Sequence, residues 1–124
     1  MIIGVGIDII EVDRVGGKLL AANSFRDKVF SQLEIDFCES KSNKMQHYAA
    51  RFAAKEAFLK AAGIGLTASY NLPEIEVITD ELGKPSLHLQ GNFLTLAREK
   101  AWNKIHLSLS HVQAMACAVV ILEQ

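Results

Sequence analysis

The sequence predicts an α+β fold formed by one domain that spans residues 1–124. The predicted helices and strands do not alternate regularly along the chain, which favours α+β over a doubly wound parallel sheet. A length of 124 residues allows one hydrophobic core, but a (β/α)8 barrel needs about 200 residues or more. Hydrophobic residues make up 50% and charged residues 22% of the chain, which excludes a largely disordered protein.

The chain opens with a predicted strand. Residues 2–12 are rich in β-branched side chains, which predicts a buried strand. Alternate side chains of a strand point to opposite faces. One face of this strand therefore carries Val5, Ile7 and Ile9, and the other carries Gly4, Gly6 and Asp8.

Three helices are predicted to follow. Asp13 is a plausible N-cap for a short helix that runs to about Ala22. The segment Ser31-Gln-Leu-Glu34 is a capping box and predicts the start of a second short helix. The longest helix is predicted to begin at residue 42 or 43 and to end at residue 62, because Gly63 is a typical C′ glycine.

The second half is predicted to form two hairpins on either side of a helix. The predicted elements are a strand over 72–79, a turn over 80–85, a strand over 86–90, a helix over 92–103, and strands over 105–110 and 114–122. The candidate core positions of the helix are Phe93, Leu96, Ala97 and Trp102.

The charges are unevenly distributed. The net charge is −1, which argues against a protein that coats nucleic acid. Residues 14–60, however, hold nine basic and five acidic side chains. This locally basic segment predicts a discrete anionic partner rather than a long polyanion.

The two cysteines and the apolar runs limit the cellular context. Cys38 and Cys117 lack CxxC spacing, so we expect neither a disulfide framework nor a zinc site, and Cys117 is predicted to be a small buried hydrophobe. Acidic residues at positions 8, 11 and 13 interrupt the apolar start, which argues against a signal peptide. No apolar run reaches 18 residues, so we expect no membrane span and a cytoplasmic protein.

Two carboxylates interrupt otherwise apolar faces. Asp8 lies within the first strand, and Glu56 lies within the apolar stripe of residues 45–59 on the long helix. Each has a structural alternative: Asp8 could accept backbone N–H groups, and Glu56 could pair with Lys60 or Arg51. Taken together, two inward carboxylates suit Mg²⁺ that is shared with a phosphorylated substrate.

Basic residues, glycines and one histidine complete the candidate site. The cationic face formed by Arg51, Lys55 and Lys60 is either simply solvated or binds an anion beside the segment Gly63-Ile-Gly65, whose glycines allow a close approach to backbone N–H groups. His111 ends a strand and could cap local backbone instead of acting chemically. No nucleophile elbow surrounds the serine that precedes it.

Four motifs in order resemble the holo-[acyl-carrier-protein] synthase family, the small AcpS-type 4′-phosphopantetheinyl transferases. These motifs are Gly4-Val-Gly6-Ile-Asp8-Ile-Ile-Glu-Val-Asp-Arg14, Arg51-Phe-Ala-Ala-Lys55-Glu56-Ala-Phe-Leu-Lys60-Ala-Ala-Gly63-Ile-Gly65, Gly83-Lys84-Pro85 and Leu107-Ser-Leu-Ser110-His111. The resemblance covers essentially the whole chain.

The resemblance implies both a fold and a reaction. The fold would be a mostly antiparallel sheet packed on one long helix, assembled as a homotrimer with coenzyme A between neighbouring subunits. The reaction would move 4′-phosphopantetheine from coenzyme A to a serine of apo acyl carrier protein, with Mg²⁺ as the cofactor, in fatty acid biosynthesis. It would release holo carrier protein and adenosine 3′,5′-bisphosphate.

The resemblance also implies roles for individual residues. Asp8 and Glu56 would bind the metal and, with Lys60, form the catalytic group, while Lys60 would also contact the pyrophosphate. Arg14 would dock the acidic carrier protein. The remaining coenzyme A contacts would come from Gly63, Gly65, Lys84, Pro85, Ser110 and His111.

Two other functions fit part of the pattern. A magnesium enzyme that hydrolyses another pyrophosphate would use the same carboxylates and Lys60, but it would leave the basic segment unexplained. A non-catalytic module that binds a nucleotide or an acidic protein would make Glu56 a structural ion-pair partner. Mass spectrometry of an apo carrier protein, after incubation with coenzyme A and Mg²⁺, separates the three.

Overall fold

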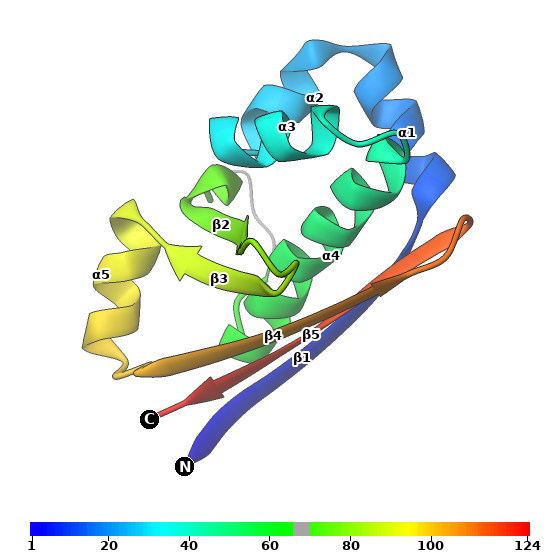
Figure 1. The fold of residues 1–124 in the computed structure, drawn as a ribbon. Helices are drawn as coiled ribbons and strands as arrows, with labels where there is room; N and C mark the ends of the chain where they lie inside the picture. The colour runs from blue at the N-terminus through cyan, green and yellow to red at the C-terminus, as the bar shows by residue number, and fades with distance from the viewer. Residues whose placement is uncertain (66–69) are drawn as a thin grey trace.

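The computed structural model describes residues 1–65 and 70–124. In chain order, its elements are β1 (Ile2–Glu11), α1 (Val12–Ala21), α2 (Asn23–Val29), α3 (Gln32–Glu39), α4 (Lys44–Ala62), a 3₁₀ turn η1 (Leu72–Glu74), β2 (Ile75–Thr79), β3 (Pro85–Leu89), α5 (Gly91–Glu99), β4 (Lys104–His111) and β5 (Met115–Glu123). One antiparallel sheet has the order β1-β5-β4, and β2 and β3 form a separate antiparallel hairpin. This confirms the predicted α+β class with a mostly antiparallel sheet on one long helix (Figure 1).

Helix α4 lies across one face of the three-stranded sheet (Figure 1). The middle strand β5 turns every second side chain toward the helix, and these side chains are buried: Ala116, Ala118, Val120 and Leu122. The helix contributes small buried residues, among them Ala49, Ala53, Ala57 and Ala61. Alanine side chains on both elements allow a short distance between helix and sheet, and the resulting close packing builds the core.

Strand β1 approaches α4 even more closely because of two glycines. A Cβ atom added at Gly6 would overlap the carbonyl oxygen of Ala57, and one added at Gly4 would overlap that of Ala61. No side chain fits between the strand and the helix backbone there, so both positions require glycine. The glycine face of the predicted strand is therefore the face that contacts the helix.

The other face of β1 is open, which corrects the prediction of a buried strand. Val5, Ile7 and Ile9 are 60%, 66% and 66% exposed. They lie beside Ile121, Val119 and Cys117 of β5 in the antiparallel register. Together these residues form an apolar outer face on the side of the sheet opposite α4. The β-branched run identified the strand correctly, but it could not reveal that only one face of the strand is covered.

Several predicted boundaries shift. Glu11 and not Asp13 is the N-cap residue of α1, and Asp13 lies in the first turn, where its charge still suits the helix dipole. Helix α2 was not predicted, and its N-cap residue Ala22 has no side chain that could cap it. Helix α5 ends at Glu99 instead of residue 103, because Ala101 adopts a positive φ of 57°. Residues 72–74 form the 3₁₀ turn and do not belong to the strand.

Both cysteines are free in the described part of the chain, and they differ in burial. Cys38 is fully buried, and burial raises the pKa of its thiol to about 12. Cys117 is only half-buried, because its position in β5 points to the outer face. The prediction that Cys117 is a buried hydrophobe is therefore wrong. Among residues 1–65 and 70–124, no helix has the length and apolarity needed to cross a membrane.

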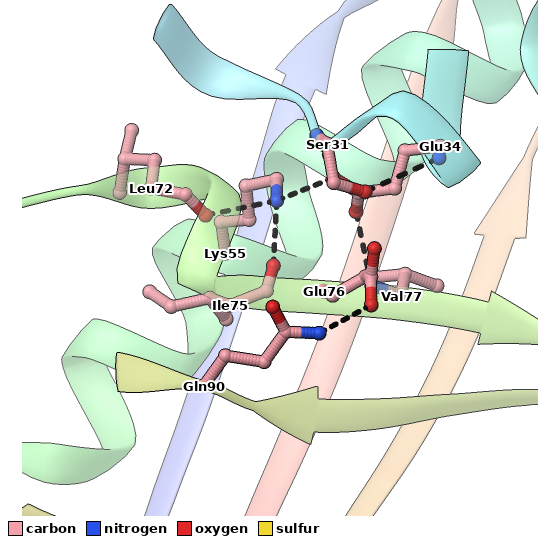
Figure 2. A network of polar contacts seen from close by, with 8 residues as sticks. All are labelled: Ser31, Glu34, Lys55, Leu72, Ile75, Glu76, Val77 and Gln90. Atoms are coloured by element: carbon pink, nitrogen blue, oxygen red, sulfur yellow. Dashed lines mark hydrogen bonds and ion pairs between the residues drawn. The ribbon is translucent and has the colours of Figure 1, made fainter. Parts of the chain in front are cut away.

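A buried ion pair joins α3 to α4. The side chains of Glu34 and Lys55 are both 0% exposed, and Lys55 Nζ lies 2.8 Å from Glu34 Oε1. The ammonium also donates to the carbonyl oxygens of Leu72 and Ile75, at 3.0 and 2.5 Å (Figure 2). All three of its protons thus have acceptors, which a buried ammonium requires. Lys55 does not belong to a solvated helix face, and the sequence could not show this because its partners lie 17 to 21 residues away.

The Glu34 carboxylate connects three elements. It completes the predicted capping box by accepting from the Ser31 backbone N–H at 2.9 Å, while Ser31 Oγ accepts from the Glu34 N–H. Its second oxygen accepts from the Val77 backbone N–H of β2 at 2.9 Å. Figure 2 also shows the neighbouring Glu76 bonded to Gln90 at 2.8 Å. This network fixes the β2–β3 hairpin against α3 and α4.

Candidate active site

The contact between β1 and α4 brings Asp8 to Lys60. Lys60 Nζ lies 3.0 Å from Asp8 Oδ1 and 3.0 Å from the Ile7 carbonyl oxygen. The Asp8 side chain is 15% exposed and that of Lys60 is 56% exposed. Because Gly4 and Gly6 allow the strand to lie against the helix backbone, the ammonium on the last turn of α4 reaches the strand. The structural alternative, in which Asp8 only accepts backbone N–H groups, does not describe this geometry.

Glu56 lies one turn before Lys60 on the same helix and belongs to the same cluster. Its pKa is raised, first by partial burial and then by the negative charge of Asp8, while the charges of Lys60 and Lys18 act in the opposite direction. Within the described ranges, no ion pair joins Glu56 to Lys60 or Arg51. Because Glu56 and Lys60 are four residues apart on one side of α4 and Lys60 contacts Asp8, the three residues expected to be catalytic lie in one region of the structure.

The chemistry of this cluster suits a hard divalent cation that is shared with a ligand. The negative charge of Asp8 disfavours ionisation of Glu56, which a nearby cation would offset, and carboxylate oxygen is the donor that Mg²⁺ prefers. No group of three or more candidate ligand side chains is found in residues 1–65 and 70–124. The donor set thus fits Mg²⁺ that keeps open positions for phosphate oxygens, and does not fit a closed protein cage.

The end of α4 presents the first of the two expected glycines. Gly63 has a φ of 71° and ends the helix, and its N–H donates to the carbonyl oxygen of Lys60. The Ile64 N–H donates to Leu59, so the helix closes with a typical left-handed cap. Gly65 is exposed, and the residues directly after it lie outside the described part of the chain.

A cavity of about 170 Å³ lies between α4, β4 and the β2–β3 hairpin. Its lining residues are Phe37, His47, Ala50, Arg51, Thr79, Gly83, Pro85, Leu109 and His111. Arg51 is its most distinctive group: the residue is 2% exposed, and its guanidinium lies 4.0 Å from the centre of the Phe37 ring. One guanidinium nitrogen donates to Thr79 Oγ1 at 2.7 Å, but the buried Nε has no partner among the described residues. A buried cation with a free donor indicates a place for an anion.

His111 lines the same cavity. Its Nδ1 lies 2.7 Å from Oε1 of the Gln46 side chain on α4, so it does not cap local backbone. The His47 and His111 rings meet at 5.3 Å between centroids. Burial, followed by the charges of Arg51 and His111, lowers the pKa of His47. Sequence reasoning missed His47, which stands in none of the four motifs, and assigned Arg51, the first residue of the second motif, to a charged helix face.

Of the other residues expected to contact coenzyme A, Pro85 and Lys84 lie at or beside this cavity, and Ser110 does not line it. Pro85 lines it, and Lys84 is exposed in the adjoining turn, where its N–H donates to Asp80 Oδ1 at 2.8 Å. Ser110 is exposed and, by strand alternation, points to the outer face of the sheet opposite His111. Ser110 and His111 nevertheless both border a shallow groove at this end of the sheet.

Arg14 lies apart from both clusters. It is exposed on α1, which follows β1 directly. The same helix carries Lys18, whose charge reaches Glu56. The basic side chain of Arg14 is thus accessible to a partner that approaches the site from the α1 side.

Comparison with known proteins gives consistent matches. A family model described as 4′-phosphopantetheinyl transferase superfamily matches residues 4–120. The chain is 45% identical to a holo-[acyl-carrier-protein] synthase of Syntrophus aciditrophicus, over 99% of this chain and 97% of that protein. It resembles the crystal structure of the holo-[acyl-carrier-protein] synthase from Neisseria meningitidis with a TM-score of 0.91 and 28% identity, over 100% of both chains. The Bacillus anthracis synthase in complex with CoA (3′,5′-ADP) matches with a TM-score of 0.80 and 35% identity, over 98% of this chain and 96% of that one.

Proposed function

The chain belongs to the 4′-phosphopantetheinyl transferase superfamily, and from this membership we propose how its residues carry out the reaction. The reaction transfers 4′-phosphopantetheine from coenzyme A to a serine of apo acyl carrier protein in fatty acid biosynthesis. The serine oxygen bonds to the phosphorus that carries pantetheine and gives up its proton. The bond from that phosphorus to adenosine 3′,5′-bisphosphate breaks. Of the three functions considered from the sequence, the transferase is therefore the one that holds.

The grouping of Asp8, Glu56 and Lys60 is the observation that carries this proposal. Phosphoryl transfer depends mainly on positioning the reactants and stabilising negative charge, and it needs little covalent help from the protein. Lys60 would donate to the diphosphate of coenzyme A. Asp8 and Glu56 would hold Mg²⁺, which when bound supplies two positive charges beside the diphosphate. Gly63 and Gly65 would let the backbone after α4 approach the phosphates.

The cavity around Arg51 would take the nucleotide end of coenzyme A. The free Nε of the buried guanidinium supports a phosphate there, since Arg binds phosphate with directed donors. Pro85 and Lys84 of the hairpin turn and His111 of β4 would contact the same end. Both clusters lie on α4, but Arg51 is on the opposite side of the helix from Lys60, nine residues away. One coenzyme A would contact both clusters in a site shared between neighbouring subunits.

The direct test of the function is the modification of a carrier protein. Incubation of this protein with coenzyme A, Mg²⁺ and an apo acyl carrier protein should increase the mass of the carrier by one phosphopantetheine group. Mass spectrometry measures this, and a carrier with its acceptor serine replaced by alanine is the control. An unmodified wild-type carrier would refute the proposed function.

Arg14 is the proposed contact for the acidic carrier protein. The Arg14→Glu variant should raise KM for the carrier protein, while KM for coenzyme A changes little. A charge at the rim of an interface acts mainly on the encounter rate and contributes about 0.2–1 kcal/mol when exposed, and a reversed charge adds repulsion to that loss. Steady-state kinetics at two salt concentrations measures both constants. Equal changes in both KM values, with an unaltered salt response, would contradict the docking role.

The outer face of the sheet supports a homotrimer of these 1–124 domains. Val5, Ile7 and Ile9 expose a continuous apolar strip on β1, next to Val119 and Ile121 of β5. An apolar strip of this kind marks an interaction site. In a homotrimer, Ser110 on the same face would contact a neighbouring subunit, which agrees with a coenzyme A site shared between chains. The trimer would work in the cytoplasm.

Sedimentation tests the trimer. Wild-type protein should sediment with about three times its subunit mass of 13.6 kDa. The Ile7→Glu variant places a charge at the centre of the apolar strip and should shift the protein to monomer, with loss of transferase activity. Leu82, 96% exposed at the tip of the β2–β3 hairpin, is the matched control, and Leu82→Glu should remain a trimer. A wild-type monomer that is active at the assay concentration would contradict the shared site.

A further inference from the structure

The Lys60 ammonium is bonded to a carboxylate oxygen of Asp8 that a metal ion would need as a ligand. The ammonium lies 3.0 Å from Asp8 Oδ1 and completes its bonding at the Ile7 carbonyl oxygen, also at 3.0 Å. The ammonium thus places a positive charge beside Asp8, where the two carboxylates would otherwise bind a cation. In this arrangement the ammonium and a divalent cation compete for the same carboxylate.

We propose that Lys60 is a placeholder for the divalent cation and makes cation binding depend on the diphosphate of the substrate. This inference rests on the proposed function, in which Asp8 binds the cation and Lys60 binds the diphosphate. Without substrate, the ammonium neutralises Asp8 and repels a divalent cation. When a diphosphate binds, its oxygens accept the hydrogen bonds of the Lys60 ammonium. Asp8 is then free to bind the cation.

The two partners differ in mobility in the way that this exchange requires. Asp8 is held on a strand whose glycines lie against the α4 backbone, and its side chain is only 15% exposed. Lys60 is more than half exposed, and a lysine stem of four carbons can swing its ammonium over several ångströms at small cost. The ion pair is therefore opened by moving Lys60, while the carboxylate stays in position.

The exchange couples two binding events. Because the diphosphate removes a competitor of the cation, it must raise the affinity for the cation, and by linkage the cation raises the affinity for the diphosphate by the same factor. The empty site would then bind divalent cations weakly, and a cation would be held tightly only together with a diphosphate. Such coupling keeps the cation out of the site until there is charge for it to neutralise.

Mn²⁺ is a suitable probe, because electron paramagnetic resonance measures its free concentration directly. We would titrate Mn²⁺ into wild-type, Lys60→Met and Lys18→Met proteins alone, with coenzyme A, and with adenosine 3′,5′-bisphosphate, which lacks a diphosphate. Lys18 is the matched control, because its charge also acts on Glu56 but its ammonium lies over the Phe25 ring, 5.6 Å from the ring centroid. A titration of coenzyme A without protein corrects for its own binding of Mn²⁺. Circular dichroism verifies that each variant is folded, and Lys60→Gln replaces Lys60→Met if the latter does not fold.

The expected result is specific to Lys60. Wild-type protein should bind Mn²⁺ at least tenfold more tightly with coenzyme A than alone, and adenosine 3′,5′-bisphosphate should give less than half of that gain. Lys60→Met should bind Mn²⁺ alone at least fivefold more tightly than wild type, and its gain from coenzyme A should be at least threefold smaller.

Two other results would overturn the placeholder alone. They are an Mn²⁺ affinity of Lys60→Met no higher than that of wild type, and an equal increase in Lys18→Met, which would indicate a diffuse effect of charge. Absence of Mn²⁺ binding by every protein, even with saturating coenzyme A, would instead refute the metal site under the proposed function, and the placeholder with it.

Discussion

Glu56→Gln and Asp8→Asn should each lower kcat of carrier-protein modification by about 10²–10³-fold, the typical loss on removal of one preorganised electrostatic group. Both substitutions keep the size of the side chain and one oxygen, but they remove the charge that the proposed cation requires. Discontinuous assays with saturating coenzyme A and Mg²⁺, followed by mass spectrometry of the carrier protein, measure the rate. A variant with near-normal activity would remove that residue from the metal site.

Protein stability separates this role of Glu56 from a structural one. Partial burial and the charge of Asp8 raise the pKa of Glu56 above its usual value of 4.5. A carboxyl with a raised pKa binds more protons in the folded protein than in the unfolded one, so its contribution to stability is present below pH 4.5 and is lost as pH rises through the folded pKa. At pH 7 the ionised Glu56 therefore disfavours folding.

Glu56→Gln should consequently have a Tm at pH 7 that equals or exceeds that of wild type, and the difference should shrink toward pH 4. Thermal unfolding followed by circular dichroism across this pH range measures it. If Glu56 instead stabilised the fold through an ion pair, as in the binding-module alternative, the variant would melt at a lower temperature than wild type.

Local sequence signals predicted the parts of the fold that depend on neighbours in the chain. The capping box at Ser31, the left-handed Gly63 and the long helix between them were all readable, because each depends on contacts within a few residues. The short helix α2 was missed because it starts without a side-chain cap at Ala22. The exposure of Val5, Ile7 and Ile9 was missed because only the glycine face of β1 meets α4, at Ala57 and Ala61, far away in the sequence.

The candidate site was also predicted only in part from the sequence. Asp8 and Glu56 stood out because each interrupts an apolar pattern, and the structure brings both to Lys60. The surroundings of Arg51 did not stand out, because its contacts with Phe37 and Thr79 span 14 and 28 residues and follow no periodic pattern. A charged residue on a helix is predicted to be exposed to solvent unless the element that covers it is known. For Arg51, that element is the β2–β3 hairpin.

The largest expected effect on stability comes from Lys55. The Lys55→Met variant keeps an apolar stem of similar length but removes the only cation bonded to the buried Glu34 in the described chain. Removal of one partner of a buried ion pair leaves an uncompensated charge, which costs about 3–5 kcal/mol. Chemical denaturation measures this as a lower midpoint. An exposed lysine, Lys28, is the control, because Lys28→Met should change the free energy of unfolding by no more than about 0.5 kcal/mol.

The double variant Glu34→Gln/Lys55→Met tests whether charge is the cause. It removes both charges, and the amide oxygen introduced at position 34 can still accept one of the two backbone N–H groups, of Ser31 and Val77, that Glu34 now satisfies. The double variant should therefore be more stable than the sum of the two single losses predicts, with a coupling energy of about 0.5–3 kcal/mol. Strict additivity would show that the two charges do not stabilise one another.

The Lys55→Met substitution should also affect the cavity around Arg51. Lys55 binds the carbonyl oxygens of Leu72 and Ile75, and Glu34 binds the Val77 N–H, so this network holds the β2–β3 hairpin against α4 (Figure 2). The hairpin contributes Thr79 and Pro85 to the cavity beside Arg51. Lys55→Met should therefore raise KM for coenzyme A more than KM for the carrier protein at a temperature where the variant remains folded. A stable variant with both KM values unchanged would show that the hairpin is held in place without the ion pair.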